Sequence, residues 1–209
     1  MSNNLSMFPR TLLLARHGET DWNRDQRLQG HTDIPLNDLG HRQARRLAER
    51  LAGTAVAALQ ASDLARAAAT ARILGDALDL EPALLPAWRE IDLGDLEGED
   101  SLATVRAQGE LISAAARTEG PLGRGGESFR DFHARIVAGY ERLCRDHAGQ
   151  TVLIVSHGGT LKALIAHLIG LDPTRIGRLS LRGNTSLSIV DFQHGRPQLT
   201  LLNCTRHLD

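Results

Sequence analysis

The chain has 209 residues, which is long enough for one domain with a substantial core. With 42% hydrophobic residues and a formal net charge of −1, it has no overall attraction to nucleic acid or to a membrane surface. No stretch approaches the length of a transmembrane helix. The two cysteines, Cys144 and Cys204, form no motif, so we expect both to be unpaired in a cytoplasmic protein.

The first third of the chain alternates apolar runs with helical patterns. Residues 11–15, TLLLA, are typical of a strand buried on both faces. Apolar side chains recur at helical spacing through residues 37–53, which predicts an amphipathic helix. A second apolar run, 56–62, ends at Ser62. We expect this serine to cap a helix that continues to about residue 78.

The rest of the chain repeats this alternation. Residues 128–149 predict a helix capped by Ser128, and residues 151–156 predict a third buried strand. A short apolar helix is expected over 161–170. The tail, 186–203, is expected to form two strands joined by a Gly-Pro turn.

Strands that alternate with helices predict an α/β fold. We expect a three-layer sandwich, with a mostly parallel central sheet and helices on both faces. Residues 1–209 are interpreted as a single domain. Within it, residues 1–10 are expected to be a flexible head, and the weakly periodic stretch of about 90–126 a cap or loop excursion.

Two of the predicted strands end in the same way. The first runs into Arg16-His17-Gly18 and the third into His157-Gly158. In open α/β sheets, ligands bind beyond the carboxyl ends of the strands, and glycine lets the backbone approach a ligand closely. A lone histidine is usually structural, but two His-Gly strand ends predict a functional pair.

Arginines and carboxylates add to this edge. Arg16 directly follows a buried run and needs an anionic partner, while Arg66 is either a second phosphate ligand or a solvated helix residue. Carboxylates in the segment 89–99 could supply a proton donor, although their spacing does not choose among them. No cysteine or histidine cluster has metal-ligand spacing, so we expect neither a metal nor a cofactor.

The segment LLLARHGETDWN resembles the signature of the histidine phosphatase superfamily, the phosphoglycerate-mutase-like group. Five further blocks follow the family's pattern in the family's order: LQGHTDIPLNDLGHRQA, SDLARAAATA, REIDLGDLEG, GGESFRDFHARI and VLIVSHGGTLKALI. Together they cover most of residues 11–165. The resemblance implies a phosphoglycerate-mutase-like fold.

The resemblance also implies catalytic roles. His17 matches the family's nucleophile, which is phosphorylated during turnover. Arg16, Arg66 and His157 match the rest of the phosphate pocket. Glu90 matches the carboxyl group that acts as general acid and then as base. Such a pocket suits phosphoryl transfer without a metal, because two arginines disfavour an imidazolium and compensate the phosphate charge.

Four more residues match positions around the substrate. Asn23 matches a polar residue that contacts the phosphoryl group, and Gly158 a backbone N–H that faces the phosphate. Gln29 and Gly30 match a loop beside the substrate. His31, which follows them, either lines the substrate entrance or lies on the loop surface.

Phosphoglycerate mutases of this group are longer and carry a basic insertion after the general acid. In this chain the corresponding interval, 91–125, has no lysine and no Arg-Arg pair. The shorter phosphatases of the family, among them α-ribazole-phosphate and broad-specificity phosphatases, fit better. Leu96 stands where the family often has an aromatic residue, which leaves the shape of one pocket wall open.

The expected function is therefore a metal-independent phosphomonoesterase with a phosphohistidine intermediate. Its expected partners are a small phosphorylated substrate and phosphate as the product, with no nucleic acid and no membrane. Two alternatives stay open: a cofactor-dependent phosphoglycerate mutase, and an inert relative that binds phosphorylated ligands. A homodimer also stays open.

Overall fold

The computed structural model describes residues 7–100 and 120–209. The strands of this part of the chain are β1 (Thr11–Arg16), β2 (Ala58–Ala61), β3 (Ala83–Leu84), β4 (Thr151–Ser156), β5 (Leu187–Gln193) and β6 (Arg196–Cys204). The α-helices are α1 (Asp21–Arg24), α2 (Asp38–Leu51), α3 (Ala65–Leu78), α6 (Phe129–Asp146) and α7 (Gly158–Leu168). Short 3₁₀ helices are η1 (Pro86–Trp88), η2 (Gly94–Leu96), η3 (Pro173–Arg178) and η4 (Arg206–Leu208).

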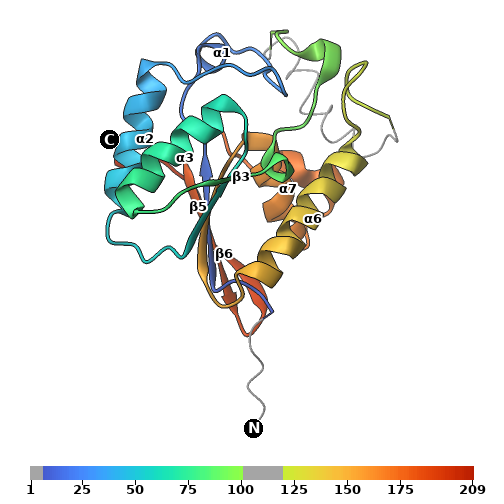
Figure 1. The fold of residues 1–209 in the computed structure, drawn as a ribbon. Helices are drawn as coiled ribbons and strands as arrows, with labels where there is room; N and C mark the ends of the chain where they lie inside the picture. The colour runs from blue at the N-terminus through green and yellow to red at the C-terminus, as the bar shows by residue number, and fades with distance from the viewer. Residues whose placement is uncertain (1–6, 101–119) are drawn as a thin grey trace.

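The strands form one sheet in the order β3-β2-β4-β1-β5-β6. The pairings from β3 to β1 are parallel, and the pairings of β5 with β1 and β6 are antiparallel. Helices α2 and α3 cover one face of the sheet, and α6 and α7 cover the other (Figure 1). The prediction of an α/β fold with a mostly parallel sheet between two helical layers is confirmed.

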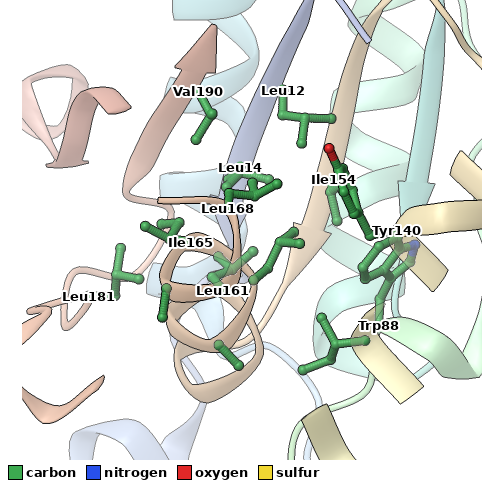
Figure 2. Packing of buried hydrophobic residues seen from close by; sticks show 14 of the residues in the cluster. Leu12, Leu14, Trp88, Tyr140, Ile154, Leu161, Ile165, Leu168, Leu181 and Val190 are labelled. Carbon is green, nitrogen blue, oxygen red and sulfur yellow. The ribbon is translucent and has the colours of Figure 1, made fainter. Parts of the chain in front are cut away.

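Alternate residues of the central strands enter two separate cores. Leu12 and Leu14 of β1 pack toward α6 and α7, as Figure 2 shows, and Ile154 of β4 joins them. Leu13 and Ala15 face the opposite side and pack toward α2 and α3. This two-residue alternation is what a strand buried on both faces requires, and it explains why the run of apolar residues in β1 is continuous.

The pairing of β1 with β4 fixes where the functional residues lie. Arg16 is level with Ser156, so His17 and His157 leave the sheet at the same edge. The N–H of His17 still donates to the carbonyl of Ser156 at 2.9 Å. Both histidines therefore begin from a rigid part of the sheet, as the two His-Gly strand ends predicted.

The cap of α3 differs from the prediction. The residue that precedes the helix is Leu64, which has no capping side chain, and Ser62 lies outside it. Ser62 Oγ accepts from the N–H of Leu64 at 3.3 Å, while the N–H of Ala65 donates to Asp33 Oδ1 at 2.6 Å. A carboxylate from a distant loop thus caps this helix, and no local pattern could indicate it. The Ser128 cap of α6 is confirmed, because its Oγ accepts from the N–H of Asp131.

The C-terminal hairpin also corrects the prediction. Its turn is formed by His194 and Gly195, whose φ angles of 52° and 75° are those of the tight turns that suit antiparallel strands. Pro197 lies inside β6, not in the turn. Helix α7 begins three residues earlier than expected, at Gly158.

Other expectations are met in part. Cys144 and Cys204 are both free. In the described ranges 7–100 and 120–209, no helix is long and apolar enough to cross a membrane. Most of the expected head and cap, residues 1–6 and 101–119, lies outside the described residues, so both stay predictions.

The chain after β1 passes directly against the first turn of α2. A Cβ atom on Gly18 would lie 2.5 Å from the carbonyl oxygen of Gly40, and one on Gly40 would overlap the backbone of Glu19. Both positions therefore need glycine, and the helix end fixes the backbone that follows His17.

We expect Gly40→Ala to lower the free energy of unfolding by about 1–3 kcal/mol, because the new methyl group meets backbone that cannot rotate away. The phosphatase activity expected from the sequence should fall with it, since the displaced segment adjoins His17. Urea unfolding and initial rates measure both effects. Arg42→Ala, at an exposed position of the same helix, should change stability by no more than about 0.5 kcal/mol. Wild-type stability in Gly40→Ala would contradict the contact.

Candidate active site

Three buried polar side chains gather at the carboxyl ends of β1 and β4. His17 is 3% exposed, and His157 and Arg66 are each 1% exposed. The two imidazole rings lie 5.1 Å apart between centroids and are tilted by 56°. Arg66, from the first turn of α3, is not a solvated helix residue, so the structure excludes that reading of the sequence.

The hydrogen bond of His17 defines which ring nitrogen is free. Its Nδ1 lies 2.6 Å from the carbonyl oxygen of Gly18, so Nδ1 carries the proton and Nε2 holds a lone pair. Burial lowers the pKa of His17 well below its usual value, and the charges of Arg66 and Arg16 lower it further. The ring is therefore neutral, with a nucleophilic nitrogen, at neutral pH.

Arg66 connects His157 to the loop after α1. Its Nε donates to His157 Nδ1 at 3.2 Å, and its two Nη atoms donate to the carbonyls of Thr32 at 2.9 Å and Gly30 at 2.7 Å. Burial lowers the pKa of Arg66 to about 10, which leaves it charged at neutral pH. Because His157 Nδ1 accepts, the proton of this ring is on Nε2.

Donors around His17 have no protein acceptor. Within residues 7–100 and 120–209, the buried atoms His157 Nε2 and Arg16 Nε make no hydrogen bond. The N–H of Gly158, the first residue of α7, also has no acceptor there, while Arg16 Nη1 donates to the carbonyl of Arg182. Unsatisfied buried donors are costly. Their convergence, with two guanidinium groups, is that of a site for an anion.

Glu90 lies beside these donors. Its Oε1 accepts from the N–H groups of Ile91 at 3.0 Å and Thr160 at 3.1 Å, and its Oε2 accepts from the N–H of Gly159 at 2.9 Å. A Cβ on Gly159 would overlap the Glu90 carboxyl group, so only glycine admits this contact. The N-terminus of α7 thus holds Glu90 through backbone groups that need an acceptor anyway.

Asn23 and Gln29 lie at the side of the site formed by α1. Asn23 Oδ1 accepts from Asn184 Nδ2 at 3.1 Å, and the same nitrogen lies 3.2 Å from the carbonyl oxygen of His17. Gln29 Oε1 accepts from Thr20 Oγ1 at 3.0 Å. Sequence reasoning missed Asn184, which ties Asn23 to the backbone of His17; only its position just before β5 could have indicated it.

Residues 12–205 match the sequence profile of the histidine phosphatase superfamily (branch 1). The chain belongs to the histidine phosphatase superfamily. A relative named probable phosphoglycerate mutase GpmB, from Enterobacter sp. (strain 638), is 39% identical over 182 residues, which is 86% of this chain and 84% of the relative. The resemblance stated from the sequence blocks is confirmed.

Solved structures agree with this membership. Phosphoserine phosphatase from Entamoeba histolytica, in complex with phosphoserine, is 32% identical with a TM-score of 0.83, covering 95% of this chain and 99% of its own. A mycobacterial glucosyl-3-phosphoglycerate phosphatase with VO3 is 31% identical with a TM-score of 0.80, covering 93% and 99%. The fold of this chain is therefore shared with phosphatases over nearly its whole length.

Three other carboxylates near Glu90 in the sequence are engaged elsewhere. Asp95 Oδ2 pairs with Arg124 at 3.2 Å, and Asp92 Oδ2 lies 3.5 Å from Nδ1 of His31. Glu97 accepts from the N–H of His31 at 2.7 Å. Glu90 is thus the carboxylate of this segment that lies against the N-terminus of α7. His31 itself is half-buried, with Nε2 2.8 Å from the Glu90 carbonyl oxygen.

Glu97 holds the loop whose carbonyl groups bind Arg66. Both of its oxygens accept backbone N–H groups, from His31 at 2.7 Å and Thr32 at 2.8 Å. Gly30 has a φ of 50°, and a Cβ there would overlap the Glu97 carboxyl group. The loop held in this way presents the two carbonyls that orient Arg66. Sequence reasoning named Glu97 only as a rival acid and missed this role.

The described part of the chain, 7–100 and 120–209, has no group of three or more His, Cys, Asp or Glu side chains that could hold a metal ion. The positive charge of the site comes from Arg16 and Arg66. Leu96, where the family often has an aromatic residue, packs against the core on the α6 and α7 side.

The two buried histidines predict how stability depends on pH. Burial, together with Arg66 and Arg16, lowers the pKa of both His17 and His157 well below 6.5. In the unfolded chain they titrate near pH 6.5, so below that pH the unfolded state binds protons that the folded state does not. We expect the free energy of unfolding to fall on acidification below about pH 6.5, each histidine contributing up to about 1.4 kcal/mol per pH unit, and not to depend on these groups above it.

Urea unfolding across this range, for the wild type and for His17→Asn, measures the effect. The slope against pH is compared, not the absolute stability, because the substitution also changes packing. The variant should lose one histidine's share of the acid slope. An unchanged slope would mean that His17 protonates in the folded state as it does in the unfolded chain.

Proposed function

We propose that this protein is a metal-independent phosphomonoesterase that hydrolyses a small phosphorylated metabolite through a phosphohistidine at His17 Nε2. The observation that carries the proposal is the free Nε2 of a neutral, buried His17 beside unsatisfied donors of Arg16, His157 and Gly158. A phosphoryl group on this nitrogen would meet a hydrogen-bond donor on several sides at once.

In the first step Nε2 attacks the phosphorus atom and forms the N–P bond, while the bond from phosphorus to the leaving oxygen breaks in line with it. The hydrogen bond from Nδ1 to the Gly18 carbonyl keeps the ring in the correct orientation and stabilises the positive charge that develops on it. In the second step water attacks phosphorus, the N–P bond breaks, and inorganic phosphate leaves.

Charge on the transferred phosphoryl oxygens is stabilised by Arg16, Arg66, His157 Nε2–H and the N–H of Gly158. The guanidinium groups are fixed before substrate arrives, since Arg66 is held by two carbonyls and Arg16 by the carbonyl of Arg182. Preorganised donors need no reorganisation during the reaction, which is the main source of electrostatic catalysis. These two cations supply the charge that a divalent metal supplies in other phosphatases.

Glu90 is proposed as the general acid and then the base. Its Oε1 accepts from the N–H groups of Ile91 and Thr160 and lies 3.4 Å from Thr160 Oγ1, whereas Oε2 accepts only from Gly159 within the described residues. Oε2 therefore has a lone pair left for the proton that the leaving alkoxide takes. After the leaving group departs, the same oxygen can accept a proton from the attacking water.

The relatives support a small phosphorylated substrate. The Entamoeba histolytica enzyme is described with phosphoserine and also with 3-phosphoglyceric acid, and the mycobacterial phosphatase with inorganic phosphate. Phosphoserine and 3-phosphoglyceric acid each carry a carboxylate besides the phosphate. We infer a substrate of this size for the present chain.

A phosphoglycerate mutase is the second candidate, favoured by the names of relatives that are 38–39% identical. A mutase must retain a bisphosphorylated intermediate. The interval 91–125 has no lysine, and Arg124 pairs with Asp95. The interval therefore offers little free positive charge to hold a bisphosphorylated intermediate, which supports a phosphatase over a mutase. An inert relative is disfavoured by the full set of His17, Arg16, Arg66, Glu90 and His157.

We expect rapid mixing with labelled p-nitrophenyl phosphate, quenched in base, to trap a phosphoenzyme that is labile in acid. His17→Ala should form none and should lose at least about 10³-fold in kcat, because the nucleophile is absent. The control is His147→Ala, at the C-terminal end of α6, which should behave like the wild type. EDTA should leave the rates unchanged. Phosphoenzyme formation in His17→Ala, or loss of activity in EDTA restored by Mg²⁺, would refute the mechanism.

Glu90→Gln tests the general acid through the leaving group. An alkoxide needs a proton as the P–O bond breaks, while nitrophenolate leaves without one. The variant should therefore slow phosphorylation by an alkyl phosphate by about 10²–10⁴-fold, and by p-nitrophenyl phosphate far less. The phosphorylation step must be isolated in a pre-steady-state burst, because Glu90 also serves the water step. Asp95→Asn is the matched control. Equal slowing of both substrates in Glu90→Gln would assign the acid elsewhere.

A further inference from the structure

Helix α7 presents a lysine one turn beyond the glycine that faces the phosphate site. Lys162 follows Gly158 by four residues, so both lie on the same face of the helix, about 6 Å apart. Side chains on a helix lean toward its N-terminus. The stem of Lys162 therefore runs back over the turn of Gly158, toward the mouth of the site.

Lys162 is the only lysine of the chain, and it is half-buried. Among residues 7–100 and 120–209 it has no hydrogen bond and no ion pair. The charged groups that act on it are Glu90, Arg16 and Arg182, and burial lowers the pKa of its ammonium group. A partly desolvated cation without a hydrogen-bonded partner destabilises the free protein. Such a cation is typical of a ligand-binding site.

A second cation lies across from it. The carbonyl of Arg182 accepts from Arg16 Nη1, and the carbonyl oxygen of Leu181 would lie 3.4 Å from a Cβ on Gly158. Residues 181–182 are thus fixed against the N-terminus of α7. The Arg182 side chain is exposed and has no partner within the described ranges, and its charge repels that of Lys162.

We propose that Lys162 and Arg182 form a second anion subsite, which binds a carboxylate on the leaving group of the substrate. This inference rests on the proposed phosphatase function and specifies its substrate class: phosphate monoesters of hydroxy acids. The subsite adjoins Glu90, where the leaving oxygen is protonated, so the group that it binds is the part of the substrate beyond that oxygen.

Charge favours a carboxylate over a second phosphate. Glu90 lies beside the subsite and becomes a carboxylate once it has given its proton to the leaving group, so its negative charge then opposes a second dianion more than it opposes a carboxylate. A monoanion fits this balance. A carboxylate can accept from the ammonium group and from the guanidinium group together, which would relieve their repulsion.

The test uses two substrates that differ only in the carboxylate: 3-phosphoglycerate, and glycerol 3-phosphate, which has a hydroxymethyl group in its place. We expect the wild type to have a kcat/KM at least about tenfold higher for 3-phosphoglycerate, and Lys162→Met to lose that preference by slowing this substrate alone. Lys162→Arg should retain the preference, and Arg182→Gln should weaken it. Arg178→Gln removes a cation from an exposed position of η3 and should keep it.

Three results would overturn the proposal. The first is equal kcat/KM of the wild type for both substrates. The second is an equal loss of kcat/KM on both substrates in Lys162→Met. That result would mean that Lys162 acts through Glu90 and not on the carboxylate, and it would leave the phosphatase proposal intact. The third is a lower midpoint of thermal unfolding in Lys162→Met, since removal of an unpaired cation should leave the midpoint unchanged or raise it.

A binding measurement separates this inference from the proposed function. Calorimetry with His17→Ala, which needs no turnover, should give tighter binding of 3-phosphoglycerate than of glycerol 3-phosphate, and the added Lys162→Met should remove the difference. If the wild type hydrolyses no phosphate ester but this binding difference is present, the phosphatase proposal fails and the subsite stands. If binding shows no difference, the subsite fails whatever the activity.

Discussion

The site depends on one buried guanidinium group. Arg66 is 1% exposed, so its donors have to be satisfied inside the protein. By donating to His157 Nδ1, it forces the proton of that ring onto Nε2, where it is available to an anion. Its other donors require the carbonyls of Gly30 and Thr32, and Glu97 holds the loop that carries them. The burial of a single charge thus sets a tautomer and the conformation of a loop.

Much of this could be predicted from the sequence, because it follows from short-range patterns. The apolar runs at 11–15 and 151–156 indicated buried strands, and the parallel sheet then brought His17 and His157 to one edge. The choice of Glu90 and the catalytic roles of the five expected pocket residues came from a family resemblance that spans several ordered blocks. The structure brings these residues together, and it separates Glu90 from neighbours that sequence spacing could not exclude.

What the sequence did not indicate depends on contacts between distant segments. Asp33 in place of Ser62 caps α3, and Asn184 joins Asn23 to His17, across more than half of the chain. Glu97 acts through backbone N–H groups, which have no sequence signature at all. Such partners are chosen by the packed fold, so a local pattern cannot identify them.

The position of β1 in the sheet has a consequence for synthesis of the protein. Its neighbours are β4 and β5, so the strand that carries His17 is made near the beginning of the chain but is paired only by segments from the last third. A growing chain on the ribosome exposes the His17 segment long before His157 exists. Pairing over such separations is slow. The emerging chain therefore lacks His157 and the strands that pair with β1, and the proposed site is complete only after β4 and β5 have joined the sheet.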